Sequence, residues 1–230
     1  MDMRTALIVG TGAGLSASLA RLFAKHGMQV AMASRNPDKL QKLAEETAGA
    51  TFACEATEPE EVAALFDVVV ATQGVPDIVV YNASARARGP VTELDPGDVA
   101  RAIAVSAYGG FLVAQQAARL MAARGSGAIL LTGASASVKG YPNSSAFAMG
   151  KFALRGLAQS MARELSPKGV HVAHFVIDGG IRSAGRQDPA ENPDSLLDPD
   201  AIAETYWQIA NQPRSAWTWE VELRPWVEKF

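Results

Sequence analysis

The chain has 230 residues, a length suited to one α/β core, and its 48% hydrophobic and 20% charged residues are typical of a globular protein. The net charge of −3 offers no basis for attraction to nucleic acid or to an anionic membrane, and we expect neither partner. The single cysteine, Cys54, excludes an internal disulfide and lies in an apolar run that predicts a buried thiol. No apolar run has the length of a membrane span and residues 1–4 show no signal-peptide pattern, so we expect a soluble, cytoplasmic protein.

The first predicted unit is a strand, a glycine-rich turn and a helix. Residues 6–9 are continuously apolar, as in a strand buried on both faces, and an apolar stripe of helical period begins at Leu15. Between them stand Gly10, Gly12 and Gly14. A turn without Cβ atoms brings the backbone and the N–H groups of a helix N-terminus close to a phosphate. The pattern favours a nucleotide site formed by this turn and the start of the helix over the alternative of an ordinary tight turn.

The second predicted strand, residues 30–33, and a helix at 38–48 complete a βαβ unit. In such a unit the tip of the second strand meets the adenosine ribose, where a carboxylate selects NAD and an arginine accommodates the 2′-phosphate of NADP. The tip here carries Ser34 and Arg35 and no carboxylate. It favours NADP(H), with NAD(H) as the alternative, unless Arg35 is only a solvated loop charge.

Alternation of strands and helices continues along the rest of the chain. Further strands are predicted at 51–54, 78–81, 128–131, 170–177 and 217–223, with helices at 59–73, 99–124, 145–165 and 201–210. This pattern specifies an α/β fold: a single-domain, Rossmann-like doubly wound parallel sheet over residues 1–230, with helices on both faces. Residues 183–200 contain three prolines and interrupt the alternation, so we expect a mobile excursion that serves as a substrate lid.

Two of the predicted strands carry polar residues that bear on ligand binding. His171 and His174 share one strand, but their odd separation places them on opposite faces, so no metal site is expected. The fourth strand ends in Asn82, Ala83 and Ser84. These small residues and the amide suit contact with a cofactor at the carboxyl edge of the sheet, or equally an asparagine turn.

With this order of elements, the chain resembles the short-chain dehydrogenase/reductase family over nearly its whole length. The segment Gly10-x-x-x-Gly14-x-Ser16 is similar to the family's cofactor turn Gly-x-x-x-Gly-x-Gly, with serine at the third glycine. The tripeptide at 82–84 resembles the family's Asn-Ala-Gly, and residues 178–183 stand where relatives carry Pro-Gly and Thr. The resemblance implies a nicotinamide cofactor held by Gly10, Gly12, Gly14, Leu15, Ser34, Arg35, Asn82, Ala83, Lys151 and Ser183.

The same resemblance reveals a departure at the catalytic positions. In the family, a tyrosine exchanges a proton with the substrate oxygen, a lysine lowers the pKa of that tyrosine and binds the ribose, a serine holds the substrate oxygen, and an asparagine supports a proton relay. Phe147 stands in the place of the tyrosine, Ala134 in that of the serine and Ser106 in that of the asparagine. Lys151 alone matches. The chain therefore resembles a divergent member with phenylalanine for the catalytic tyrosine.

A replacement proton donor has to come from a nearby side chain. We expect Lys151 to be the acid, because burial beside a cationic nicotinamide lowers the pKa of an ammonium group. Ser135 is the second catalytic candidate, since it adjoins the position of the missing serine. Further candidates, each also explained as a helix cap, a loop aromatic or a turn former, are Ser144, Ser145, Tyr141 and Asp178.

Three functions are compatible with this pattern. The first is an NADP(H)-dependent oxidoreductase of the short-chain type that transfers hydride between nicotinamide and a small carbonyl or alcohol, using a non-standard acid/base site. The second is a catalytically silent NADP(H)-binding protein, a sensor or subunit, and the third is an enzyme that transfers protons without net redox change. We favour the first, because hydride transfer needs only positioning and the chemistry of the cofactor.

The resemblance also implies a homodimer or homotetramer. The helix at 99–124 and the helix that follows Phe147 correspond to the subunit-contact helices of the family. Near the C-terminus, two roles are possible for a further group of residues: a second subunit interface or a cap on the core. These residues are Arg214, Trp217, Trp219 and Trp226.

Overall fold

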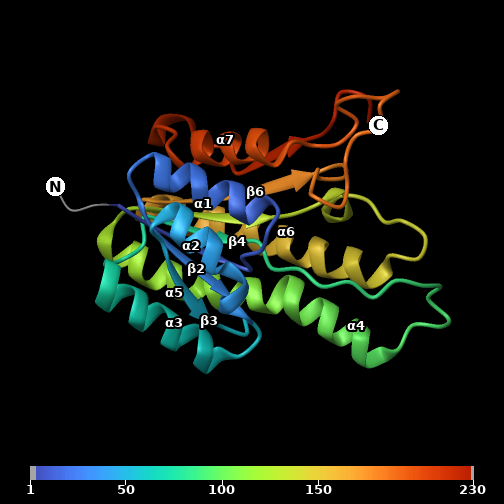
Figure 1. Ribbon diagram of the computed structural model, residues 1–230. Coiled ribbons are helices and arrows are strands. Elements are labelled where there is room, and N and C mark those ends of the chain that lie inside the picture. Colours follow the sequence, from blue (N-terminus) through green and yellow to red (C-terminus); the bar gives the residue numbers. More distant parts are fainter. Residues whose placement is uncertain (1–3, 229–230) are drawn as a thin grey trace.

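The computed structural model describes residues 4–228, which are built around one seven-stranded parallel sheet (Figure 1). The strands lie in the order β3-β2-β1-β4-β5-β6-β7, which confirms the predicted doubly wound α/β fold. Because successive strands are added outward in both directions, the order reverses between β1 and β4, and ligands of such sheets bind at this switch point. The strand bounds are β1 Thr5–Val9, β2 Gln29–Ser34, β3 Ala50–Ala53, β4 Ile78–Tyr81, β5 Gly127–Thr132, β6 Val170–Ile177 and β7 Glu220–Leu223.

Helices cover both faces of the sheet (Figure 1). One face carries α1, α2 and α7, and the other carries α3, α5 and α6, with α4 packed beside α6. The helix bounds are α1 Leu15–Lys25, α2 Gln41–Thr47, α3 Pro59–Gln73, α4 Pro96–Ile103, α5 Gly109–Arg124, α6 Ser145–Leu165 and α7 Pro199–Ala210. Among residues 4–228, no helix combines the length and the apolar character needed to cross a membrane.

The strand period of two divides the core into two layers. Along β1, Ala6 and Ile8 pack with α1 and α7, whereas Leu7 and Val9 pack with α3 and α5. All four side chains are buried. Burial of each large apolar side chain contributes about 1.5–3 kcal/mol, so the continuously apolar strand is held from both faces.

The predicted helix at 99–124 is wrong in its extent and its continuity. The helix begins earlier, at Pro96, because the Asp95 carboxylate accepts a hydrogen bond from the Asp98 amide at 3.0 Å and proline suits the first helical position. It is then interrupted by a π-helical turn at Ala104–Tyr108 before α5 begins. Inside this turn the carbonyl of Val105 accepts a hydrogen bond from the Tyr81 hydroxyl of β4. The local sequence pattern cannot predict this contact, because its two partners are 24 residues apart in the chain.

The last strand is shorter than predicted, since β7 begins only at Glu220. The amide of Thr218 donates to the Gln212 side chain at 2.8 Å, and the Trp217 indole donates to the Gln212 carbonyl at 3.1 Å. The Trp217 ring also stacks on His171 at 4.7 Å between centroids. These contacts bind Trp217 and Thr218 to the preceding turn, so both residues lie outside the strand although their types favour β structure.

The segment at 183–200 folds back toward the end of β6. Bridges join Ile181 to Leu197 and Ser183 to Arg186. The guanidinium of Arg182 lies 2.7 Å from the Asp188 carboxylate and also pairs with Asp194 and Asp198. The segment ends earlier than predicted, because α7 starts at Pro199, where proline again occupies the first helical turn.

Candidate active site

The carboxyl ends of β1, β4, β5 and β6 bring the predicted site segments to one edge of the sheet. The glycine turn follows β1, Asn82 follows β4, Ala134 and Ser135 follow β5, and Asp178 follows β6. Parallel strands end at the same edge, which is why segments more than a hundred residues apart meet there.

The glycine turn is fixed by its contact with the end of β4. Gly10 has a φ of +86°, and a Cβ at this position would lie 2.3 Å from the amide nitrogen of Ala83, so only glycine fits. The Asn82 amide donates to the Ser16 hydroxyl at 2.6 Å, and that hydroxyl donates to the Gly10 carbonyl at 3.1 Å. The asparagine therefore joins the two turns.

The start of α1 is arranged to receive an anion. Its N-cap residue, Gly14, supplies no side-chain hydrogen bond, and its first turn contains no acidic residue. A Cβ at Gly12 or Gly14 would meet no atom within 4 Å, so the backbone borders open space. Free N–H groups and the positive end of the helix dipole then face that space, which fits a cofactor phosphate.

At the tip of β2, the Ser34 hydroxyl oxygen is buried and has no hydrogen-bond partner among residues 4–228. A buried polar atom of this kind calls for a partner, and a ribose hydroxyl or phosphate oxygen would supply one. The next residue, Arg35, is exposed. These residues fit the adenosine end of a dinucleotide.

Lys151 lies on α6 with 2% of its surface exposed. Its ammonium donates to the Thr132 carbonyl at the end of β5, at 2.7 Å. Burial, followed by the nearby charge of Arg86, lowers the pKa of Lys151 to about 7. An ammonium with this pKa exchanges a proton readily near neutral pH.

Phe147, one turn before Lys151, presents an aromatic face where the resemblance implies a tyrosine hydroxyl. The guanidinium carbon of Arg86 lies 4.0 Å from the centroid of this ring, and the Lys151 ammonium lies 5.8 Å from it. Both distances fall within the range of cation–π attraction. An aromatic ring with two basic side chains near it thus stands in place of the missing hydroxyl. Arg86 is a site residue that the sequence pattern did not predict.

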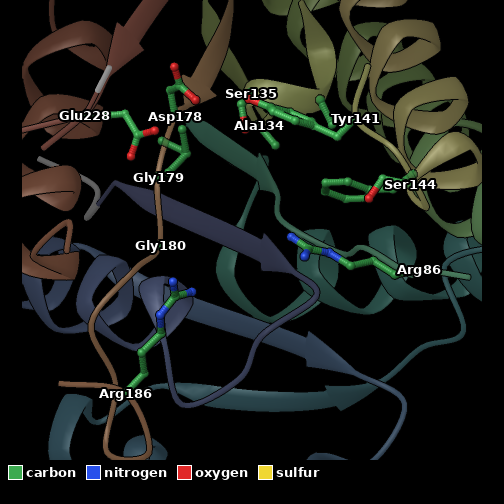
Figure 2. Close-up of a pocket in the computed structure, with 13 residues that line it drawn as sticks. Arg86, Ala134, Ser135, Tyr141, Ser144, Asp178, Gly179, Gly180, Arg186 and Glu228 are labelled. Atoms are coloured by element: carbon green, nitrogen blue, oxygen red, sulfur yellow. The ribbon is translucent and has the colours of Figure 1, made fainter. Parts of the chain in front are cut away.

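A cavity of about 220 Å³ opens at this edge of the sheet (Figure 2). Four of the predicted catalytic candidates line it: Ser135, Tyr141, Ser144 and Asp178. The catalytic candidates Lys151 and Ser145 and the predicted cofactor residue Ser183 are not among its lining residues. The polar side chains that line it include Arg86, Ser135, Tyr141, Ser144, Asp178 and Arg186.

The candidates in the cavity differ in what already engages them. The buried Asp178 carboxylate lies 3.1 Å from the Lys139 ammonium and 3.7 Å from the Arg224 guanidinium, so it serves an ion-pair cluster. Ser144 is the N-cap residue of α6, but its side chain makes no capping hydrogen bond. The buried Ser106 hydroxyl lies 3.4 Å from the Ala85 carbonyl oxygen, next to the loop that carries Arg86.

The two strand histidines are engaged separately. A ring nitrogen of His171 lies 2.8 Å from the Thr218 carbonyl oxygen, and His174 lies 3.1 Å from the Glu220 carboxylate. Within residues 4–228, no group of three or more His, Cys, Asp or Glu side chains is placed to hold a metal ion.

The fold and these contacts define an α/β protein with a glycine turn at the switch point of its sheet, and comparison with known proteins shows its family. The family model described as short chain dehydrogenase matches residues 4–193, and the chain belongs to this family. It is 28% identical to an uncharacterized oxidoreductase of Staphylococcus aureus, over 96% of this chain and 97% of that protein. It is 30% identical to (+)-borneol dehydrogenase 1 of Salvia officinalis, over 79% and 72% of the two chains.

Solved structures show the same relationship. A short-chain dehydrogenase from Rhodopseudomonas palustris is 35% identical, with a TM-score of 0.85 over 97% of this chain and 99% of that one. A metagenomic short-chain oxidoreductase in complex with NADP is 26% identical, with a TM-score of 0.83 over 98% of both chains. The family is one of oxidoreductases, and NADP is bound by a structural neighbour.

Proposed function

We propose that this chain is an NADP(H)-dependent oxidoreductase that transfers hydride between nicotinamide and a small carbonyl or alcohol. The observation that carries the proposal is the buried Lys151, whose pKa of about 7 suits an acid that works near neutral pH. At the same carboxyl edge of the sheet, the glycine turn and the uncapped start of α1 fit a dinucleotide. When bound, the cofactor supplies the hydride donor or acceptor.

Each part of the site has a separate task in this proposal. The glycine turn and the start of α1 bind the cofactor phosphates, while Ser34 and Arg35 bind the ribose and its 2′-phosphate. During reduction, the Lys151 ammonium provides the proton that reaches the substrate oxygen, and Ser135 holds that oxygen. During oxidation, the neutral amine takes the proton back. Asn82 and Ala83 support the cofactor by fixing the turn.

The cofactor assignment is tested by fluorescence titration of the purified protein with NADPH and with NADH. We expect NADPH to bind about tenfold more tightly, because Arg35 gains a charge-assisted hydrogen bond to the 2′-phosphate. Arg35→Gln should remove that preference and leave NADH binding unchanged. Lys39→Gln, on the exposed surface of the following turn, is the matched control and should retain the preference. If neither nucleotide binds, the proposal is wrong.

The role of Lys151 is tested by the pH dependence of turnover with a panel of small ketones and aldehydes. Reduction requires the ammonium, so kcat should be constant below a pH of about 7 and fall as the pH rises above it. Lys151→Gln should lower kcat by about 10²–10⁴-fold. Tight NADPH binding without turnover on any substrate would instead favour a catalytically silent cofactor-binding protein, which the absence of hydroxyls at Phe147 and Ala134 also favours.

We further propose that the protein forms a homodimer or homotetramer through α5 and α6. Large apolar side chains on these helices and on the preceding π-helical turn are exposed. The segment at 183–200 is proposed as the substrate lid, because Arg186 within it lines the cavity.

A further inference from the structure

Two arginines from distant parts of the chain face the same cavity. Arg86 lies in the loop between β4 and α4, and Arg186 lies in the turn that follows β6. Figure 2 shows both guanidinium groups directed into the space between these two segments. Both side chains remain accessible to solvent, as groups that receive a ligand must be.

Neither guanidinium is satisfied by the protein. Among residues 4–228, neither side chain forms a hydrogen bond or an ion pair. Arg155 and Arg182 differ in this respect, since each pairs with a carboxylate at 2.6–2.7 Å. A guanidinium has five N–H donors in a fixed planar arrangement that matches an oxyanion.

Contacts that use no N–H donor nevertheless hold both groups in position. Arg86 lies over the Phe147 ring at 4.0 Å. Arg186 packs on the backbone of Gly180, where a Cβ would come within 2.3 Å of the guanidinium carbon. The two cations are therefore positioned in advance, which reduces the entropy lost when a ligand binds.

The carboxylates that line the cavity leave the two guanidinium groups available to bind an anion. The pKa of Arg86 is lowered mainly by burial and to a smaller extent by the positive charges of Arg88 and Arg186. The Asp178 carboxylate in the cavity wall already pairs with Lys139 and Arg224. The other acidic lining residue, Glu228, stands beside Asp178 in Figure 2, away from the two guanidinium groups.

We propose that Arg86 and Arg186 together bind an oxyanion of the substrate, a carboxylate or a phosphate, so that the substrate of this enzyme is a small organic anion. This inference rests on the proposed function, because it takes the cavity as the substrate site. It also assigns a purpose to Phe147: the ring supports the guanidinium that recognises the anion. The cofactor phosphates belong to the start of α1 and are not the ligand of this pair.

The test uses two non-reducible probes of almost equal size, oxamate and oxamide, which differ by a carboxylate in place of an amide. Binding of each to the full chain is measured by calorimetry, with and without saturating NADPH, and inorganic phosphate forms a third arm. We expect oxamate or phosphate to bind at least about tenfold more tightly than oxamide. Arg86→Gln and Arg186→Gln should each abolish that preference. Arg119→Gln, an exposed arginine on α5, is the control and should retain it.

The outcomes distinguish failure of the anion site from failure of the proposed function. A stronger effect of oxamate than of phosphate assigns a carboxylate, and the reverse assigns a phosphate. Equal binding of oxamate, phosphate and oxamide, or a preference that survives both substitutions, overturns the inference, even where NADPH binds normally. If Arg86→Gln and Arg186→Gln weaken NADPH binding without changing the preference for anions, the pair serves the cofactor and the inference also fails. Anion preference without NADPH binding would support the anion site but overturn the proposed function.

Discussion

Burial of Lys151 has a cost in folding free energy that depends on pH. Its pKa is about 7 in the folded chain and close to 10.5 when unfolded, so the unfolded chain binds more protons between these values. The free energy of unfolding therefore rises with pH across this window. Lys151→Met removes the titrating group. We compare the free energy of unfolding of the variant with that of the wild type. The difference, variant minus wild type, should be greatest below pH 7 and smaller by about 2–4 kcal/mol near pH 10.5.

The measurement for this prediction is urea unfolding without cofactor at several pH values between 6 and 10. Lys42→Met, at an exposed position on α2, is the control and should show no such trend. A Lys151→Met difference that is independent of pH would mean that the lysine is charged throughout the range.

Phe147 gives a second prediction at the level of single residues. Phe147→Tyr restores the hydroxyl that the family uses, yet Ala134 still lacks the hydroxyl that orients the substrate. The guanidinium of Arg86 also occupies the face of this ring. We expect the variant to gain less than about tenfold in NADPH oxidation with simple ketones. The double variant Phe147→Tyr/Ala134→Ser is the comparison, and a large gain in the single variant would contradict this reading of the site.

Among the elements, the edge strand β7 depends on one carboxylate. Glu220 accepts two hydrogen bonds from the Arg155 guanidinium of α6, at 2.6 and 2.8 Å, and lies 3.1 Å from a ring nitrogen of His174 on β6. It thus joins β6, β7 and α6. Burial lowers the pKa of His174 to about 4, so its ring is neutral and donates to the carboxylate at neutral pH.

Glu220→Gln should therefore lower the free energy of unfolding by about 1–3 kcal/mol, because it removes the charged acceptor of a bidentate pair. Thermal unfolding at pH 7 measures the loss. Glu204→Gln, an exposed glutamate on α7, should change the midpoint by less than one degree. Equal midpoints for the two variants would show that Glu220 adds nothing to the attachment of β7.

The elements also show what local sequence patterns can and cannot predict. The bounds of α3, β4, α6 and β6 agree with prediction, because proline, glycine and apolar periodicity act within a few residues. The interruption at Ala104–Tyr108 escaped prediction, because it depends on Tyr81 of a distant strand. Arg86 escaped for the same reason: its sequence context shows only an arginine-rich loop, and its partner Phe147 is sixty-one residues away. The glycine turn was predictable, since its strand, glycines and helix are contiguous.

For the whole molecule, the exposed side chains predict where copies of the chain meet. Phe111 on α5 and Phe152 on α6 are 40% and 45% exposed, and the ring of Tyr108 stacks on Phe111 at 6.3 Å. Burial of such side chains between subunits is favourable. We expect the wild type to be a dimer or tetramer in light scattering, and Phe111→Glu/Phe152→Glu to be smaller. Val68→Glu, on α3 with 40% exposure, is the control. A monomeric wild type would refute the assembly.

The buried Cys54 has a use that extends to the whole fold. It follows β3, is enclosed by the core that packs against α3, and has a pKa raised to about 11, chiefly by burial. A thiol reagent attacks the thiolate, so the closed molecule is protected both by burial and by the low thiolate fraction. Because the sequence contains one cysteine, the rate of labelling counts openings of this part of the core alone. The native chain is therefore its own probe of local unfolding: a thiol reagent is added, and no engineered cysteine is needed.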